Sequence, residues 1–334
     1  MTDLVLAGDI GGTKAHFLLA PVDGNPRKPI AEERMPTAGS TSCEELVARF
    51  LKNTGAKPRW IGLGIPGPVI NGRVRPTNLT WEADPVTVAQ ACGAEKAVFV
   101  NDLVATALGI PFLHDDEQEI LLPGIIGDGP VAVIAPGTGL GEAWLQPIGQ
   151  TWAAHPSEAG HSDYAPRGAR QRTIHAVVEQ EFGQVSLEML ASGRGIPILW
   201  RALGSVEIQG RLLRDSLDVE AAVAAANDPT PLIMAAALDP IKNPRSAATA
   251  EELALNLIQE CGNVALRLMA TGGVVLAGGV PPRILPWLRQ PAILAAFRKN
   301  VALSGLLSKI QLKVSLNGGI AVFGAWSAGR QLAK

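Results

Sequence analysis

Hydrophobic and polar positions form their clearest pattern at the start of the chain. Two apolar runs, over residues 4–8 and 15–20, are joined by Gly11, Gly12 and Thr13. Glycine adopts backbone conformations with positive φ at no steric cost, so apolar runs joined in this way predict a β-hairpin. A glycine turn also leaves its backbone N–H groups uncovered, and these can converge on an anion such as phosphate.

The same pattern of strand, Gly/Thr turn and strand recurs over residues 131–145. Thr138 stands in this second turn where Thr13 stands in the first. Either hairpin by itself could be an ordinary glycine-rich turn, but two phosphate-cradling hairpins indicate related half-domains that face a nucleotide. Asp9, at the mouth of the first turn, is placed to hold a metal-bound water near the same phosphate.

Apolar spacing predicts the remaining elements of an α/β chain. Short apolar runs predict strands at residues 29–36, 60–65, 97–100 and 271–277. Helical spacing predicts helices at residues 43–53, 103–110, 169–182, 185–190, 195–202, 219–226, 231–238 and 247–269, with a closing helix near 318–334. The helices that follow residue 167 indicate a helical elaboration of a second domain.

A third strand-to-glycine turn comes late in the chain. An apolar run ends in Gly278 and Gly279, and Pro282 follows near the first turn of a helix. Because this turn lacks side chains, an adenine ring can lie flat against its backbone. We therefore add it to the candidate nucleotide-binding segments.

Asn101 and Asp102 follow directly on a predicted strand and precede a predicted helix. Asn or Asp is the expected cap of a helix N-terminus, so a structural role is open to one of them. A cap needs only one such residue, and ligands of open α/β folds lie beyond the carboxyl ends of strands. We therefore favour a functional role for the pair.

Glu158 and His161 lie in a polar stretch, residues 151–166. Their spacing differs from the HExxH zinc motif and no cysteine assists them, so they do not predict a metal site. A Glu and a His can instead hydrogen-bond vicinal hydroxyls, although a surface loop with incidental polar residues is the alternative. Asn78, in a polar loop over residues 76–81, is a further candidate for substrate binding.

Composition narrows the class of protein. Over 334 residues, 47% are hydrophobic and 18% charged, which indicates a well-buried chain long enough for two domains. The net charge of −2 gives no electrostatic case for nucleic acid or an anionic membrane, and no apolar run is long enough to span a bilayer. The three separated cysteines fit neither a disulfide framework nor a metal cluster. With a strand predicted near residue 4, no signal peptide is expected, so we predict a cytoplasmic protein.

The order of these motifs over residues 3–330 resembles the bacterial glucokinases, in the group outside the ROK family. The matching stretches are residues 8–13, 101–102, 137–141, 158–161 and 276–279, and Glu188 within Ser-Leu-Glu-Met-Leu-Ala-Ser-Gly. The resemblance implies an α/β fold of two actin-like (ribonuclease H-like) domains with an interdomain cleft. It places a small domain at residues 1–110, joined by the helix near 318–334, and a large domain at residues 111–317.

The resemblance also implies transfer of the γ-phosphate of ATP, with Mg²⁺, to the 6-hydroxyl of D-glucose. In that family the residue that matches Asp102 is the base, and those that match Asn101, Glu158, His161 and Glu188 hold sugar hydroxyls. We expect a homodimer, with glucose and ATP as substrates. The expected nucleotide-binding residues are Gly8, Asp9, Ile10, Gly11, Gly12, Thr13, Gly137, Thr138, Gly139, Gly278 and Gly279.

Two stretches depart from the family pattern. Ala159 stands where the family often has the first glycine of Glu-Gly-Gly-His, which should leave both ligands placed. Arg194 stands in Ser-Gly-Arg-Gly where the family usually has proline, and it brings a charge beside the helix that carries Glu188. These departures concern sugar preference more than phosphoryl transfer.

Other functions are weighed against this one. A kinase for mannose, fructose or an N-acetylated hexosamine stays open, because contacts at the sugar 2-position depend on loop shape. A sugar-responsive repressor related to the ROK kinases would need a DNA-binding domain before the first strand, which only three residues precede. An actin-like or chaperone-type ATPase would leave the candidate sugar-binding residues without a common purpose.

Overall fold

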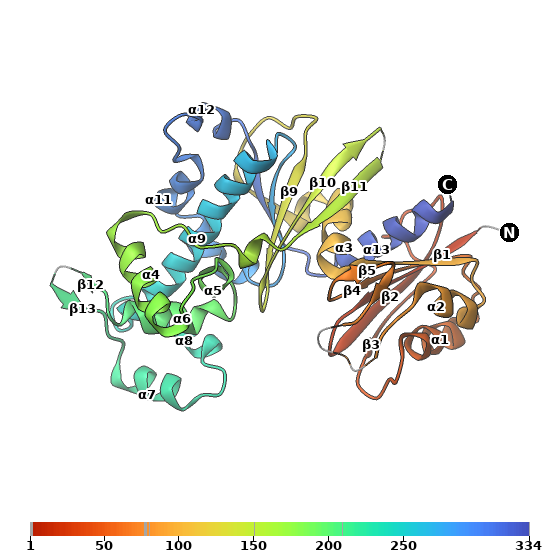
Figure 1. Ribbon diagram of the computed structural model, residues 1–334, viewed down its shortest axis with the longest axis horizontal. Helices are drawn as coiled ribbons and strands as arrows, with labels where there is room; N and C mark the ends of the chain where they lie inside the picture. Colours follow the sequence, from red (N-terminus) through yellow and green to blue (C-terminus); the bar gives the residue numbers. More distant parts are fainter. Residues whose placement is uncertain (1–2, 77–78, 80, 150, 209, 334) are drawn as a thin grey trace. The chain divides into compact units, whose positions relative to one another are not determined.

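The computed structural model describes residues 3–76, 79, 81–149, 151–208 and 210–333 (Figure 1). Over these residues the chain divides into two compact units. The first consists of Met1–Gln118, Ala143–Pro156 and Asn317–Lys334, and the second of Glu119–Glu142 and Ser157–Leu316. Strands and helices make up both units, so the predicted α/β class is confirmed.

The first sheet carries the amino-terminal hairpin. Its strands are β1 (Leu4–Ile10), β2 (Lys14–Pro21), β3 (Ala31–Pro36), β4 (Trp60–Ile65) and β7 (Lys96–Asn101). They lie in the order β3-β2-β1-β4-β7, with β1 antiparallel to β2 and parallel to β4, and with β4 parallel to β7. The predicted hairpin is confirmed. The carboxyl ends of β1, β4 and β7 therefore share one edge of the sheet.

Helices cover both faces of this sheet. They are α1 (Cys43–Thr54), α2 (Pro85–Cys92), α3 (Asp102–Gly109) and α13 (Ala321–Arg330). Shorter elements are the β5 (Val69–Ile70) and β6 (Arg73–Val74) hairpin and the 3₁₀ turns η1 (Ile110–Phe112), η2 (Asp115–Glu117) and η6 (Gln331–Ala333). Helix α1 begins after Ser42, which accepts a hydrogen bond from the Glu45 amide at 3.1 Å, and it ends at Gly55 with a φ of 65°.

Strand β1 is buried on both faces, which explains its apolar sequence. Leu6 packs in one core with Phe50 of α1. Val5 packs in another core with Trp326 of α13. Successive side chains of a strand point to opposite faces, so this one strand contributes to two cores.

Glycines bring α13 close to its neighbours (Figure 1). A Cβ atom on Gly62 of β4 would collide with the carbonyl oxygen of Ala325. A Cβ atom on Gly324 would likewise collide with the carbonyl oxygen of Ala105 in α3. The carboxyl-terminal helix is therefore held directly against the backbone of β4 and α3.

The second sheet contains the second glycine hairpin. Its strands are β8 (Gln118–Leu122), β9 (Val131–Pro136), β10 (Leu140–Ile148), β11 (Thr151–Ser157), β14 (Gly273–Leu276) and β15 (Leu312–Ser315). They lie in the order β11-β10-β9-β14-β15-β8, with β14 parallel to both β9 and β15. Strands β9 and β10 confirm the predicted hairpin. Strands β8, β11 and β15 were not predicted, and β11 stays partly exposed along its length, so it lacks the apolar run of a buried strand.

The second unit is rich in helices, as predicted. They are α4 (Gly168–Phe182), α5 (Glu188–Ala191), α6 (Gly195–Leu203), α7 (Leu217–Ala225), α8 (Thr230–Ala236), α9 (Pro244–Leu268), α10 (Leu285–Leu288), α11 (Pro291–Leu294) and α12 (Ser304–Leu307). Shorter elements are the β12 (Glu207–Ile208) and β13 (Arg211–Leu212) hairpin and the 3₁₀ turns η3 (Ala159–His161), η4 (Pro281–Ile284) and η5 (Ala295–Arg298). The helix predicted from residue 185 begins instead at Glu188, and the β12–β13 hairpin was not predicted.

The long helix α9 is buried along most of its length, polar residues included. Gln171 of α4 donates from Nε2 to Glu252 Oε1 at 2.7 Å and to Asn256 Oδ1 at 3.0 Å. The Tyr164 hydroxyl donates to the same Asn256 oxygen at 2.9 Å. These interior polar groups are paired, and they join α4 to α9. Within the described part of the chain, no helix is both long and apolar enough to cross a bilayer.

Candidate active site

The first glycine turn is bound on its carbonyl side by Thr37. The Thr37 hydroxyl donates to the Gly12 carbonyl oxygen at 2.9 Å, and the Thr37 amide donates to the Thr13 carbonyl oxygen at 3.1 Å. A trans peptide holds its C=O and N–H on opposite sides, so the Thr13 amide points away from Thr37. The turn therefore keeps a fixed shape in which this donor faces outward.

Asp9 lies at the sheet edge that the parallel strands share. It is paired in register with Gly64 of β4, and the next residue of β4, Ile65, is paired with Asn101 of β7. Burial first, and then the negative charge of Asp102, raises the pKa of Asp9 to about 6, while Arg34 lowers it. Asp9 and Asp102 thus lie close enough at this edge for the charge of Asp102 to act on Asp9.

Asn101 takes the capping role that the sequence leaves open between two residues. Its Oδ1 accepts a hydrogen bond from the Leu103 amide at 2.9 Å, and its Nδ2 donates to the Gly67 carbonyl oxygen at 3.0 Å. Asp102 is the first residue of α3, and its Oδ1 also accepts from the Leu103 amide, at 3.0 Å. The orientation of the Asn101 amide is fixed at both ends.

The first six candidate nucleotide-binding residues do not occupy equivalent places. Gly8 is buried within β1, where a Cβ atom would lie 2.6 Å from the ring of Phe17. Ile10 is also buried, in the core that contains Phe17. The turn itself is made by residues 11–13, so packing accounts for Gly8 and for the Ile10 side chain.

The second glycine turn is held by the segment between α5 and α6. The Gly193 amide donates to the Gly137 carbonyl oxygen at 2.8 Å, and the Arg194 amide donates to the Thr138 carbonyl oxygen at 3.0 Å. A Cβ atom on Gly193 would lie 2.8 Å from the Gly137 oxygen, so only glycine permits this approach. Sequence patterns missed this contact, because two backbone amides make it.

Leu140, which follows that turn, links the candidate sugar-binding residues of the second unit. Its amide donates to Glu188 Oε2 at 2.8 Å, and its carbonyl oxygen packs directly on Gly160 of η3. Glu158 and His161 are exposed at the two ends of η3. The structure therefore gathers Glu158, His161 and Glu188 around one backbone position.

Pairing of the flanking segments strengthens this grouping. The Leu187 amide donates to the Ser162 carbonyl oxygen at 2.9 Å, and Asp163 and Ser186 form an antiparallel bridge. The residues next to His161 and Glu188 are thus in direct contact. Asn78, the remaining candidate, lies outside the described residues.

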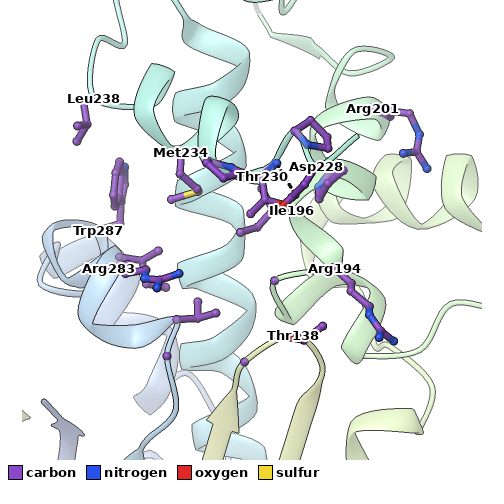
Figure 2. A pocket seen from close by; sticks show the side chains of 18 of the residues that line it. Thr138, Arg194, Ile196, Arg201, Asp228, Thr230, Met234, Leu238, Arg283 and Trp287 are labelled. Atoms are coloured by element: carbon purple, nitrogen blue, oxygen red, sulfur yellow. Dashed lines mark hydrogen bonds between the residues drawn. The ribbon is translucent and has the colours of Figure 1, made fainter. Parts of the chain in front are cut away.

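A pocket of about 1130 Å³ lies in the second unit (Figure 2). Gly137 and Thr138 of the second turn and Gly279 of the third turn line it. The third turn needs glycine at Gly278, which has a φ of 80° and approaches the Pro136 carbonyl oxygen. Two of the predicted turns therefore meet at one cavity.

Residues from the helical region form the apolar wall of this pocket. Met234, Leu238 and Trp287 lie together on one side of it (Figure 2). The amphipathic patterns of these helices also suit a protein core, so no sequence pattern distinguishes a ligand wall here. An apolar wall opposite bare glycine turns suits a flat ring joined to an anion.

Known proteins resemble this chain over nearly its whole length. The family model for glucokinase matches residues 6–332. A glucokinase of Chromohalobacter salexigens is 35% identical, with 89% of this chain and 88% of the relative covered. A glucokinase of Rhizobium etli is 31% identical, with 92% of this chain and 85% of the relative covered.

Solved structures give the same result for the fold. A glucokinase from an Antarctic psychrotroph superposes with a TM-score of 0.85 at 25% identity, covering 99% of this chain and all of the other (100%). A ROK family glucokinase from Streptomyces griseus, in complex with glucose and AMPPNP, superposes with a TM-score of 0.64 at 20% identity. The match covers 98% of this chain and 99% of the other. The predicted actin-like fold is thereby confirmed.

Proposed function

The chain belongs to the glucokinase family, and from that premise we propose how its own residues carry out phosphoryl transfer. It is a sugar kinase, an ATP:glucose phosphotransferase. Phosphoryl transfer asks a protein mainly to position its reactants and to stabilise charge. The main support for assigning residues to nucleotide binding is the pocket at which the second and third glycine turns meet.

We propose that this pocket binds ATP. The adenine would lie between the Gly278–Gly279 turn and the apolar wall that includes Trp287, and the phosphates would reach Gly137 and Thr138. The pocket's volume and its mixture of apolar wall and bare backbone support this placement. The Thr13 amide, which points away from Thr37, is proposed as a phosphate donor in its own right.

The acceptor hydroxyl is proposed to lose its proton to Asp102. A carboxylate at the carboxyl edge of parallel strands lies where α/β folds place ligands. Asn101, with its amide oriented by two hydrogen bonds, is proposed to hold a sugar hydroxyl. The cluster of Glu158, His161 and Glu188 around Leu140 is proposed to hold further sugar hydroxyls.

Mg²⁺ is proposed to accompany ATP and to be held by Asp9 through water. The support is the raised pKa of Asp9: burial and the charge of Asp102 disfavour its ionised form, and a cation near both carboxylates would favour it. When bound, the ion would supply positive charge to the phosphate oxygens. Within the described residues, no cluster of three or more His, Cys, Asp or Glu side chains forms a separate metal site.

A hexose panel tests the acceptor. ADP release would be followed with glucose, mannose, fructose and N-acetylglucosamine, each with Mg²⁺ and ATP. We expect the highest kcat/KM with glucose. A higher kcat/KM with another sugar would assign the site to that sugar, while ATP hydrolysis unaffected by any sugar would contradict the proposed acceptor site.

Cellular location and assembly stay predictions. We propose a cytoplasmic enzyme, and the free thiols of Cys43, Cys92 and Cys261 support a reducing compartment. We also propose a homodimer. Fractionation of cells and analytical ultracentrifugation of the purified chain test these two proposals separately.

A further inference from the structure

The pocket carries more positive than negative charge among its described lining residues. Arg194, Arg201 and Arg283 line it, while its described acidic lining residue is Asp228. Arg201 is paired with Glu181 at 3.0 Å, and Asp228 accepts a hydrogen bond from the Thr230 amide at 3.0 Å. The pocket as a whole therefore favours an anion.

Arg194 is the arginine whose position is tied to the phosphate-binding turn. Its amide is bonded to the Thr138 carbonyl oxygen, and the adjacent Gly193 is bonded to Gly137. Gly195, on its other side, leaves no space for a side chain because a Cβ atom would lie 2.6 Å from the Met189 carbonyl oxygen. The backbone on both sides of Arg194 is thus fixed against the turn.

The Arg194 side chain is exposed, and no hydrogen bond or ion pair of its guanidinium is found within the described part of the chain. Figure 2 shows it beside the end of the hairpin that carries Thr138, directed away from the apolar wall of Met234 and Trp287. A guanidinium presents N–H donors in a planar fork that matches phosphate oxygens. The Arg194 guanidinium therefore lies at the end of the pocket proposed to hold the phosphates, away from the end proposed to hold the adenine base.

We propose that Arg194 binds the phosphates beyond the α-phosphate of the nucleotide and so makes affinity depend on the number of phosphates. This inference rests on the proposed function, because it takes the pocket to be the ATP site. It assigns a role to the charged residue of the Ser-Gly-Arg-Gly segment. Arg194 would act as a determinant of triphosphate over monophosphate binding.

The backbone decides which variant can test this role. Arg194 has φ −65° and ψ −25°, a conformation that proline can adopt, yet proline lacks the N–H that donates to Thr138. Arg194→Pro would therefore change a backbone hydrogen bond together with the charge. Arg194→Gln removes the charge alone, and Arg194→Lys keeps the charge without the fork.

Isothermal titration with Mg²⁺-AMPPNP, ADP and AMP, without glucose, measures binding apart from turnover. We expect Arg194→Gln to weaken AMPPNP and ADP about five- to twentyfold and AMP less than about twofold, since the lost contact is charged but exposed. Arg194→Lys should fall between wild type and Gln. The difference between wild type and Gln should shrink as KCl is raised, because salt screens an exposed charge.

Arg172→Gln is the matched control, since Arg172 is an exposed arginine of α4 that does not line the pocket. It should bind all three nucleotides as wild type does. Equal AMPPNP affinity in wild type and in Arg194→Gln, or an equal loss for AMP and AMPPNP, would overturn the role of Arg194. Failure of the wild-type protein to bind AMPPNP would instead contradict the proposed nucleotide pocket. Thermal melting of each variant separates a lost contact from a lost fold.

Discussion

The carboxylate of Glu188 accepts a hydrogen bond from the backbone amide of Leu140 at 2.8 Å. Glu188 is a proposed sugar ligand, whereas Leu140 directly follows the turn proposed to bind phosphate. A side chain at Gly139 would collide with the same carboxylate, so the turn and the glutamate fix each other's position. One residue therefore connects the acceptor side and the donor side within the second unit.

Glu188→Ala should raise the KM for glucose and the KM for ATP together, each roughly tenfold. The variant removes a proposed sugar contact and also leaves the Leu140 amide without its acceptor. Glu188→Gln keeps an acceptor oxygen, so its KM for ATP should stay within about threefold of wild type. Steady-state kinetics with each substrate varied in turn measure both effects. An effect of Glu188→Ala on glucose alone would contradict the connection.

Glu158→Ala and His161→Ala should act on the sugar alone. Each removes a proposed hydrogen bond to a hydroxyl, worth about 1–3 kcal/mol, so the KM for glucose should rise about ten- to a hundredfold. The KM for ATP should be nearly unchanged, because neither residue lines the pocket proposed to bind the nucleotide. Zinc bound at these residues in a metal analysis, or a change in ATP affinity only, would show that the assignment is wrong.

Asp102→Asn should lower kcat by about 10²–10⁴, the usual contribution of a general base. Glucose and ATP binding should persist within a few-fold, since asparagine can still hydrogen-bond the hydroxyl. The melting temperature should also persist, because Asn101 provides the cap of α3. Measuring kcat, glucose affinity and melting temperature on this variant distinguishes a base from a structural residue. A kcat of Asp102→Asn equal to that of wild type would contradict the proposed mechanism.

Asn101→Asp offers a matched comparison for that variant. It keeps an oxygen that can accept from the Leu103 amide, but it loses the Nδ2 donor to the Gly67 carbonyl oxygen. We expect weaker glucose binding with a smaller fall in kcat than Asp102→Asn gives. Equal falls in kcat for the two variants would mean that the proton acceptor is not assigned to the right residue.

The buried acid pair Glu142 and Glu260 should make stability depend on pH. Burial first, and then the charge of Glu260, raises the pKa of Glu142 from 4.5 to about 8, with Arg267 opposing. Glu260 itself is paired with Arg267 at 2.8 Å and accepts from Asn263 at 2.9 Å. Glu142 is therefore the member of the pair that stays protonated in the folded protein.

The direction in which stability changes with pH follows from the protons that the folded and unfolded chains bind. Between pH 4.5 and about 8 the folded chain keeps a proton that the unfolded chain releases, so the free energy of unfolding falls as pH rises through this window. Glu142→Gln cannot ionise and should flatten this dependence. Melting temperatures from about pH 5 to 9 should cross, with Glu142→Gln the more stable at the alkaline end. Parallel curves for the two proteins would contradict the assignment.

The features predicted from sequence are those encoded locally. Glycine between apolar runs specified both hairpins, and the polar residues Asn101 and Asp102 at the end of β7 indicated the edge at which we propose the acceptor site. The contacts of Gly193 and Arg194 with the second turn could not be predicted, because they join backbone groups far apart in sequence. The apolar wall of Met234 and Trp287 could not be predicted for another reason. The sequence pattern of an amphipathic helix is the same whether its apolar face packs on a core or on a ligand.

The packing of α13 on β1 makes one core depend on two segments that are far apart in the sequence. Val5 shares its core with Trp326, which is synthesised 321 residues later (326 − 5). Until then this face of the sheet lacks α13, and the part of it that α13 covers stays open to solvent and to other nascent chains. Closing this core also joins residues that are far apart in the sequence, which slows folding. We therefore expect fragments that end before α13 to aggregate instead of folding as independent domains.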